Sequence, residues 1–356
     1  MSMRKRQEAR INRRGTKTQR RKVPLRLCAS AVCSLLVLTP AVAADKPVLV
    51  KLATVLPTGT SYHRILQSMA EEWRKAPGGG VQLVIYTGSQ MGDEADIVRR
   101  MSVGQLHAGV MSVVGLSEID KSVTALQYMP MMFRSLEEVD YIRQKLQPDL
   151  EDHLLKKGFV VLFWGDAGWV RFFSKEPGLH PADFKKFKIF TWAGDSHQVD
   201  MMKALGYQPV PLVPADILPS LQTGLITAVP VLPFYALAGQ IYGPARNMLD
   251  LNWAPLVGAT VVTKKTWDTI PAATREVLLK SALTAGEQMR VKGRAESEQS
   301  VEAMKKRGLK VQPVSPAVEA EWRQVAEQIY PKIRGAMVPA DMFDEVQRLL
   351  REYRKR

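Results

Sequence analysis

The segment from residue 48 to residue 114 alternates between short apolar runs and amphipathic ones. The run VLVKLAT, which ends before Pro57, has the period of a strand, and SYHRILQSMAEEWRKA then carries apolar side chains at helical spacing. After a PGGG turn come a second strand at VQLVIYTG, a helix at residues 93–105 and a third strand at HAGVMSVV. Strand, helix, strand, helix, strand is the order that produces a parallel sheet, so this segment favours an α/β fold.

The middle of the chain continues the alternation. Strands are predicted at FVVLFWGDAG, VRFFSKEPG, KIFTW and ITAVPVLP, with helices at DSHQVDMMKALG and PADILPSLQTG. A glycine-containing turn separates the first two of these strands. The β-rich run LVGATVVTKKTWDTIP leads back towards the first sheet, and helical patterns continue to the C-terminus. We therefore predict two α/β domains, one from residues 45–167 and 256–295, the other from residues 168–255 and 296–356.

Positive charge is concentrated at the N-terminus. The chain has 356 residues and a formal net charge of +15, a value that by itself suggests a nucleic-acid partner. Residues 1–44, however, hold eleven Lys or Arg and one acid, Glu8, which accounts for +10 of the +15 and leaves +5 for the rest. A short apolar run, LCASAVCSLLVLTP, and an A-x-A site follow the basic stretch. We predict that residues 1–44 are a secretory signal peptide, cleaved after Ala43 or Ala44.

Export determines the chemistry of the mature chain. TQRRKVPL resembles a twin-arginine signal only loosely, so we predict export by the Sec route into the periplasm. Both cysteines, Cys28 and Cys33, lie in the signal, which excludes a disulfide, a thiolate nucleophile and a cysteine-ligated metal from the mature protein. The later apolar runs are too short to span a bilayer, so the mature protein is predicted not to cross the membrane.

Known patterns of catalytic and cofactor chemistry do not occur in the sequence. The chain has 5 histidines, and no two stand at metal-ligand spacing. PGGG lacks the lysine and the glycine spacing of a phosphate loop, and neither G-x-S-x-G nor H-E-x-x-H is present. Basic and aromatic residues do not interleave as they do in nucleic-acid-binding modules. We therefore predict no enzyme activity, no metal, no cofactor and no nucleic-acid partner.

Aromatic residues gather at the ends of the predicted strands. Open α/β sheets bind ligands beyond the carboxyl ends of their strands, and ligand pockets favour domain interfaces. An exported two-domain α/β protein of this kind fits the outline of a periplasmic binding protein, which closes on its ligand by a hinge motion.

The segment YTGSQMGDEADIVRRMSVGQLHAGVMS resembles the DctP-like solute-binding proteins of TRAP transporters, which typically show Y-P-x-S-Q-L-G-D and then Q-x-G. The resemblance continues through LFWGDAGW, HPADFKKFKIF, ALGYQPVPL and LPSLQTG, and so covers nearly the whole mature chain. It implies a type II periplasmic binding protein with two α/β domains, a hinge and an interdomain ligand cleft. It also implies a receptor that captures a small-molecule solute and delivers it to the small and large subunits of a TRAP permease, driven by an ion gradient.

The chain departs from the family at the residues that usually hold a carboxylate. Phe190 stands where the family has the arginine of K-I-R, and Val170 stands at a second arginine position, with Arg171 one residue later. Arginine suits such positions because it binds a carboxylate through two parallel hydrogen bonds. Thr227 replaces the family's acid in GLITAVPV. Because these changes remove polar groups, we predict an atypical subgroup whose ligand is bulky and largely apolar or aromatic.

The predicted ligand-binding residues are mostly aromatic. They are Phe190, Trp192, Trp169, Arg171, Tyr62, Tyr235, Asp195 and Trp164. Phe190 and Trp192 share one face of a strand, so both should line the cleft or both should pack beneath it. Arg171 should point to the opposite face from Val170 unless the preceding turn redirects it.

The residues also support alternatives. Asp195 could serve only as the N-cap of the following helix. Asp195 and Asp166 could instead favour a cationic ligand packed on aromatic faces. A sensory or interaction protein that presents its ligand to a partner is compatible with the same fold, and so is an enzyme built on it. A neighbouring permease gene pair would indicate transport, whereas a neighbouring histidine kinase would indicate sensing.

Overall fold

The computed structural model describes residues 47–356, apart from the side chain of His197. The predicted signal peptide, with Cys28 and Cys33, lies outside the described residues. The strands are β1 Val48–Thr54, β2 Val81–Tyr86, β3 Ala108–Ser112, β4 Phe159–Ser174, β5 Lys188–Trp192, β6 Gln208–Leu212, β7 Ala228–Val231, β8 Asn247–Thr263 and β9 Lys310–Gln312. The helices are α1 Ser61–Arg74, α2 Glu94–Ser102, α3 Val113–Ser117, η1 Lys121–Leu126, α4 Leu136–Lys156, α5 Pro181–Phe184, α6 Ser196–Ala204, η2 Pro214–Asp216, α7 Ile217–Thr223, α8 Pro233–Ala238, α9 Lys264–Asp268, α10 Ala272–Lys305, α11 Pro316–Ile333 and α12 Ala340–Tyr353.

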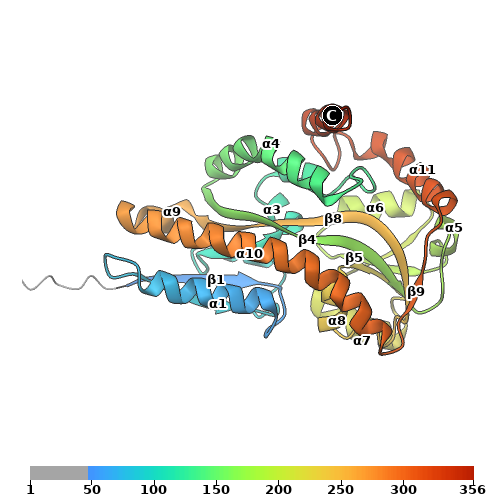
Figure 1. Ribbon diagram of the computed structural model, residues 1–356, viewed down its shortest axis with the longest axis horizontal. Helices are drawn as coiled ribbons and strands as arrows, with labels where there is room; N and C mark the ends of the chain where they lie inside the picture. The colour runs from blue at the N-terminus through green and yellow to red at the C-terminus, as the bar shows by residue number, and fades with distance from the viewer. Residues whose placement is uncertain (1–46) are drawn as a thin grey trace, which may run out of the picture. The chain divides into compact units, whose positions relative to one another are not determined.

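Within residues 47–356, nine strands form one mixed sheet in the order β2-β1-β3-β8-β4-β7-β5-β6, with β9 paired to β8. β1 is parallel to both β2 and β3, which confirms the parallel sheet predicted from the first alternating segment. A second parallel group consists of β7, β5 and β6. The long strands β4 and β8 run antiparallel to each other and join the two groups (Figure 1). The predicted α/β fold is therefore present, with its two parallel groups connected through one antiparallel pair.

β4 replaces the two strands that were predicted on either side of a turn. It continues without a break, but its pairing with β8 shifts register at three places, one of them between Asp166 and Trp169. Gly168 lies at that shift with a φ of +87°, a conformation that side chains with a Cβ rarely adopt. The glycine therefore forms a bulge inside one strand and not a turn between two.

β8 is longer than the sequence indicated. The β-rich run was predicted at residues 256–271, whereas β8 begins at Asn247 and ends at Thr263, where α9 follows. Asn252 and Pro255 interrupt the apolar pattern, yet the strand continues because β4 pairs with it on both sides of this interruption. The boundaries predicted between the two domains fall inside β4, β8 and α10, and the division itself stays a prediction.

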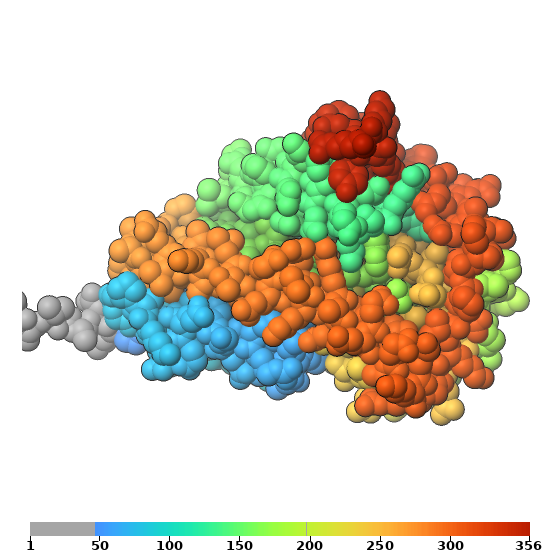
Figure 2. All heavy atoms as spheres, in the orientation of Figure 1, coloured from blue at the N-terminus to red at the C-terminus, as the bar shows by residue number. Residues whose placement is uncertain are grey.

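The long helix α10 packs against α1, β4 and α8, and so contacts elements of both strand groups (Figure 1). Figure 2 shows its residues as an orange band across one face, between the blue segment that contains α1 and the green segment that contains α4. Two ion pairs connect α10 to β4, one from Arg294 to Asp166 at 2.6 Å and one from Glu298 to Arg171 at 2.9 Å. These contacts fix the helix against the strand that crosses between the groups.

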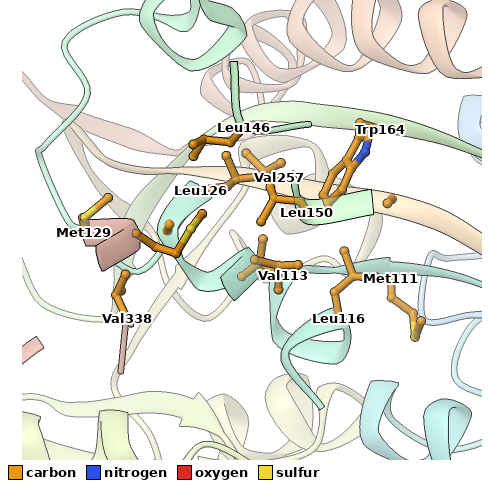
Figure 3. Packing of buried hydrophobic residues seen from close by; sticks show 14 of the residues in the cluster. Met111, Val113, Leu116, Leu126, Met129, Leu146, Leu150, Trp164, Val257 and Val338 are labelled. Carbon is orange, nitrogen blue, oxygen red and sulfur yellow. The ribbon is translucent and has the colours of Figure 1, made fainter. Parts of the chain in front are cut away.

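Buried apolar side chains fill the space between the sheet and its helices. Figure 3 shows part of one such cluster, in which Leu150 of α4 lies beside Trp164 of β4 and Val257 of β8. No helix within residues 47–356 is both long enough and apolar enough to cross a membrane.

Candidate functional site

A cavity of about 260 Å³ is lined by residues from both parallel strand groups and from the strands that join them. Four of the lining residues are the last residues of their strands: Thr54 of β1, Ser112 of β3, Trp192 of β5 and Val231 of β7. All four strands belong to parallel pairs, so the cavity lies at their carboxyl ends, which is where open α/β sheets hold ligands. This position makes the cavity the candidate ligand site.

Aromatic rings form a large part of the wall. Four aromatic residues from the predicted ligand-binding set line the cavity, namely Tyr62, Phe190, Trp192 and Tyr235, and Phe234 and Trp253 join them. The rings of Phe190 and Trp192 meet edge to face, with centroids 5.4 Å apart, and those of Tyr62 and Phe234 are 5.3 Å apart. Phe190 and Trp192 thus line the cavity together, as their shared strand face required. Their part in ligand binding stays a prediction.

Trp164 and Trp169 do not line the cavity. Both are buried in the cluster beneath α4, where Trp164 appears among the labelled side chains (Figure 3). The Trp164 indole N–H donates a hydrogen bond to Glu151 at 3.0 Å. Trp164 faces the core because its neighbours Phe163 and Gly165 face the cavity, and successive side chains of a strand alternate. Trp169 faces the core because the bulge in β4 changes which side chains face the cavity after it.

Val170 lines the cavity, whereas Arg171 does not. The Arg171 side chain is 10% exposed and forms ion pairs with Asp250 at 3.1 Å and Glu298 at 2.9 Å. After the bulge at Gly168, successive side chains alternate as in a regular strand: Val170 faces the cavity and Arg171 faces the opposite side. Arg171 is thus satisfied by two acids away from the candidate site, contrary to the expectation that it reaches the ligand.

Asp195 also lies outside the main cavity. Its Oδ1 atom accepts a hydrogen bond from the backbone N–H of Gln198 at 2.9 Å, which makes it the N-cap of α6. The N-cap role of Asp195 is therefore confirmed for its Oδ1 atom. A carboxylate at this position also interacts favourably with the positive end of the helix dipole.

Glu94 is a fully enclosed acid in the cavity wall. It is 4% exposed, and it accepts hydrogen bonds from the Ser112 and Gly115 backbone N–H groups, both at 2.8 Å, and from the Ser112 hydroxyl at 2.6 Å. Burial raises the pKa of the Glu94 carboxyl, although these hydrogen bonds act in the opposite direction. Glu94 thus occupies the start of α3 and places a carboxyl group in the wall.

Asp166 is the second acid in the lining, and a basic side chain behind the wall compensates it. The Arg294 guanidinium contacts Asp166 at 2.6 Å and Asp140 of α4 at 2.9 Å. Burial alone lowers the pKa of Arg294, but the hydrogen bonds to Asp166 and Asp140 outweigh it, so that this pKa is raised overall. Among the described side chains, no Lys, Arg or His lines the cavity. The described wall therefore offers apolar surface, hydroxyls, amides and two carboxylates, but no cationic group.

Several lining residues were missed from the sequence. Glu94 was interpreted only as part of a helix start, although it lies inside the segment that carries the family resemblance. Gln127 and Tyr128 follow η1, for which no prediction was made, and Gln127 accepts a hydrogen bond from the Val257 backbone N–H at 3.1 Å. Trp322 of α11 reaches the wall only through the tertiary fold. Within residues 47–356, no group of three or more His, Cys, Asp or Glu residues could hold a metal ion.

Known proteins share this fold at low sequence identity. The family model described as bacterial extracellular solute-binding protein, family 7, matches residues 52–335. The C4-dicarboxylate-binding periplasmic protein DctP of Rhodobacter capsulatus is 21% identical over 309 residues, which are 86% of this chain and 92% of that protein.

Solved structures of TRAP periplasmic solute-binding proteins have the same fold. The one from Xanthobacter autotrophicus Py2, with bound β-D-galacturonate, has a TM-score of 0.77 and 21% identity, covering 84% of this chain and 98% of that one. The one from Shewanella oneidensis, with bound succinate, has a TM-score of 0.79 and 17% identity, covering 85% and 99%. The architecture is that of a type II periplasmic binding protein with two domains. Because the family model matches well over half of the chain, this protein belongs to the DctP-like family 7 of bacterial extracellular solute-binding proteins, whose members are solute receptors and not enzymes.

Proposed function

We propose that this receptor binds a bulky, largely apolar or aromatic solute that lacks a carboxylate. One observation carries the proposal: the described lining of the 260 Å³ cavity contains Glu94 and Asp166 but no basic side chain. Moving a carboxylate out of water costs several kcal/mol unless a matching charge or several donors replace the lost hydration. An acid entering this cavity would meet two further carboxylates.

The positions of Val170 and Phe190 support the same conclusion. Both line the cavity at places where the family resemblance implies a carboxylate-binding arginine. Phe190 is 1% exposed and its ring contacts Trp192, so the aromatic pair fills the space that an arginine would use. Aromatic and aliphatic walls with few polar groups are typical of pockets for apolar ligands.

Backbone N–H groups at helix starts are common binding sites for anions. Here the protein's own acids accept those hydrogen bonds, because Glu94 occupies the start of α3 and Asp195 occupies the start of α6. An anionic solute would have to displace one of these carboxylates to use the same donors. This arrangement is a second obstacle to acids.

We propose further that the mature protein, exported through a Sec signal to the periplasm, delivers its solute to the small and large subunits of a TRAP permease. Membership of family 7 supports this role. Deletion of the receptor gene in its host should abolish uptake of the bound solute, and expression of the permease alone should not restore it.

Native mass spectrometry of protein purified from its host tests the ligand class. The expected result is a co-purified neutral or cationic apolar compound. In thermal-shift titrations, succinate and D-galacturonate should leave the unfolding temperature unchanged. Binding of either acid with a Kd near 1 µM or tighter, about −8 kcal/mol, would contradict the proposal.

A matched pair of variants tests the aromatic wall. Phe190→Leu should weaken binding of the co-purified compound by roughly tenfold, because an aromatic contact contributes about 0.5–1.5 kcal/mol beyond its buried area. Phe187→Leu changes another buried phenylalanine, one that does not line the cavity, and should leave the affinity unchanged. Equal effects of the two variants would place the ligand elsewhere.

A further inference from the structure

A smaller cavity of about 80 Å³, here called the annex, adjoins the main one. Val114, Tyr128 and Met337 line both spaces, so the annex lies directly beside the main cavity. The remaining described residues of the annex are mostly polar: Ser117, Glu118, Lys121, Thr124, Gly194, Asp195 and Ser196. A polar cavity thus lies next to an apolar one, with three shared residues between them.

Asp195 provides the annex with an acceptor that the protein does not use. The residue is 9% exposed, and Oδ1 caps α6, but Oδ2 is buried without a hydrogen-bond partner among the described residues. Burial, the charge of Asp195 and a hydrogen-bonding contact with the Asp195 side chain raise the pKa of Tyr128, so its hydroxyl lies beside this carboxylate. The contact does not reach Oδ2 with normal hydrogen-bond geometry. Buried polar atoms in folded proteins nearly always have partners, so a ligand is the natural donor for this one.

Charge in the annex favours a cation. Glu118 and Asp195 are acids and Lys121 is the single base among its described residues, which leaves a formal charge of −1. Glu94 of the main cavity adds a further buried carboxyl nearby, since Val114 and Tyr128 line both spaces. The positive end of the α6 dipole does not offset this negative charge, because Oδ1 of Asp195 already accepts a hydrogen bond there.

We propose that the annex holds a protonated amine at one end of the solute, bound by Asp195 Oδ2, while the apolar body of the solute fills the main cavity. This inference rests on the function proposed above and narrows its ligand class to apolar amines. A charged N–H donor suits the site because charge-assisted hydrogen bonds to a carboxylate are about twice as strong as neutral ones.

Three compounds with the same indole body and different ends test the inference by isothermal titration calorimetry. Tryptamine carries an ammonium group, tryptophol a neutral hydroxyl and indole-3-propionate a carboxylate. We expect tryptamine to bind about tenfold or more tightly than tryptophol, and indole-3-propionate to bind most weakly.

The variant Asp195→Asn removes the charge and keeps the fold, because asparagine is as good an N-cap as aspartate. It should weaken tryptamine binding by about tenfold and leave tryptophol binding unchanged. Glu118→Gln, at an exposed position of the annex, should weaken tryptamine binding by a smaller factor of about three. Asp200→Asn is the control: it removes an exposed charge from α6, the helix that Asp195 caps, at a position that lines neither cavity. It should change neither the tryptamine affinity nor the tryptophol affinity.

The outcomes separate the two proposals. If tryptamine and tryptophol bind equally, or if Asp195→Asn weakens both to the same degree, the amine inference fails and the apolar-solute proposal stands. If indole-3-propionate binds best, or if none of the three compounds binds, the proposed apolar cavity itself is wrong. Should Asp195→Asn prove unfolded by circular dichroism, the comparison of Glu118→Gln with Asp200→Asn decides the inference.

Discussion

Gly293 of α10 lies so close to Tyr62 that the two residues should be energetically coupled. A Cβ atom at position 293 would overlap the Tyr62 hydroxyl and lie 3.0 Å from its Cζ atom. The Tyr62 hydroxyl is buried without a hydrogen-bond partner among the described residues, and the ring lines the cavity beside Phe234. In Gly293→Ala, the tyrosine must therefore move.

The size of the effect follows from two opposing contributions. Replacing glycine by alanine inside a helix normally stabilises a protein by about 1 kcal/mol. Forcing an extra methyl group into a packed site costs about 1–3 kcal/mol. We therefore expect Gly293→Ala to destabilise the protein by about 1 kcal/mol, and to weaken solute binding because the displaced ring enters the cavity.

Tyr62→Phe removes the overlapping atom. The lost hydroxyl has no partner, so its removal should cost little. In the Tyr62→Phe background the overlap is relieved and the helix propensity of alanine should dominate. Gly293→Ala should then be neutral or stabilising by up to about 1 kcal/mol.

Urea unfolding of the wild type, both single variants and the double variant gives the coupling energy, which should be about 1–2 kcal/mol. Gly286→Ala is the matched control, because a Cβ there would lie 2.7 Å from Phe163 and not near Tyr62. It should destabilise the protein equally in both backgrounds. A Gly293→Ala effect that is the same with tyrosine and with phenylalanine at position 62 would refute the reasoning.

Two further predictions concern residues outside the cavity. Arg171→Met should destabilise the protein by only about 1 kcal/mol, because the side chains of its partners Asp250 and Glu298 are 44% and 66% exposed. Calorimetry should find the affinity for the co-purified solute unchanged. A loss of affinity would contradict the placement of Arg171 outside the cavity. Burial and the nearby Lys51 lower the pKa of His107 below 6.5, and its Nδ1 atom accepts the Lys51 backbone N–H at 3.0 Å, so the fold favours the neutral ring. The stability that comes from the neutral His107 ring is fully present above the pKa that His107 has in the unfolded chain. It is lost as the pH falls through the lower pKa that His107 has in the folded protein. Urea unfolding of both proteins at about pH 7.5 and about pH 5 tests this assignment. Between these two pH values, His107→Gln should lose less stability than the wild type, and the difference should be below about 1 kcal/mol because the ring is partly exposed. An identical pH dependence of the two proteins would count against the assignment.

The local features of the fold could be predicted from the sequence because they depend on short-range patterns. Alternating apolar residues and helical spacing were sufficient to place β1, α1, β2, α2 and β3, and the parallel pairing of the three strands followed from their order. Strand period two placed Phe190 and Trp192 on the same face, and both line the cavity. The N-cap role of Asp195 was likewise available from its position before a helix.

The rest of the site depends on contacts between distant segments. No local pattern shows that Gly168 forms a bulge instead of a turn, and this one difference decides that Trp169 packs in the core while Val170 lines the cavity. Trp322 comes to the wall from α11, and its ring stacks on that of Phe172 of β4, a residue more than a hundred positions earlier in the chain. Glu94 looks like an ordinary acid at a helix start until α3 is placed against it.

The ligand class proposed here rests on the distribution of charge around the cavity and not on the architecture. The Xanthobacter autotrophicus protein holds β-D-galacturonate on a similar frame, so the frame itself does not exclude acids. In this chain each carboxylate of the wall is already engaged: Glu94 by the start of α3 and Asp166 by Arg294. An incoming carboxylate would find no described cation in the lining, whereas an incoming ammonium would find Oδ2 of Asp195, which has no hydrogen-bond partner among the described residues. If the proposal is right, the volume of the cavity limits the size of the solute, and the sign of the charge around it limits the chemistry of its polar end.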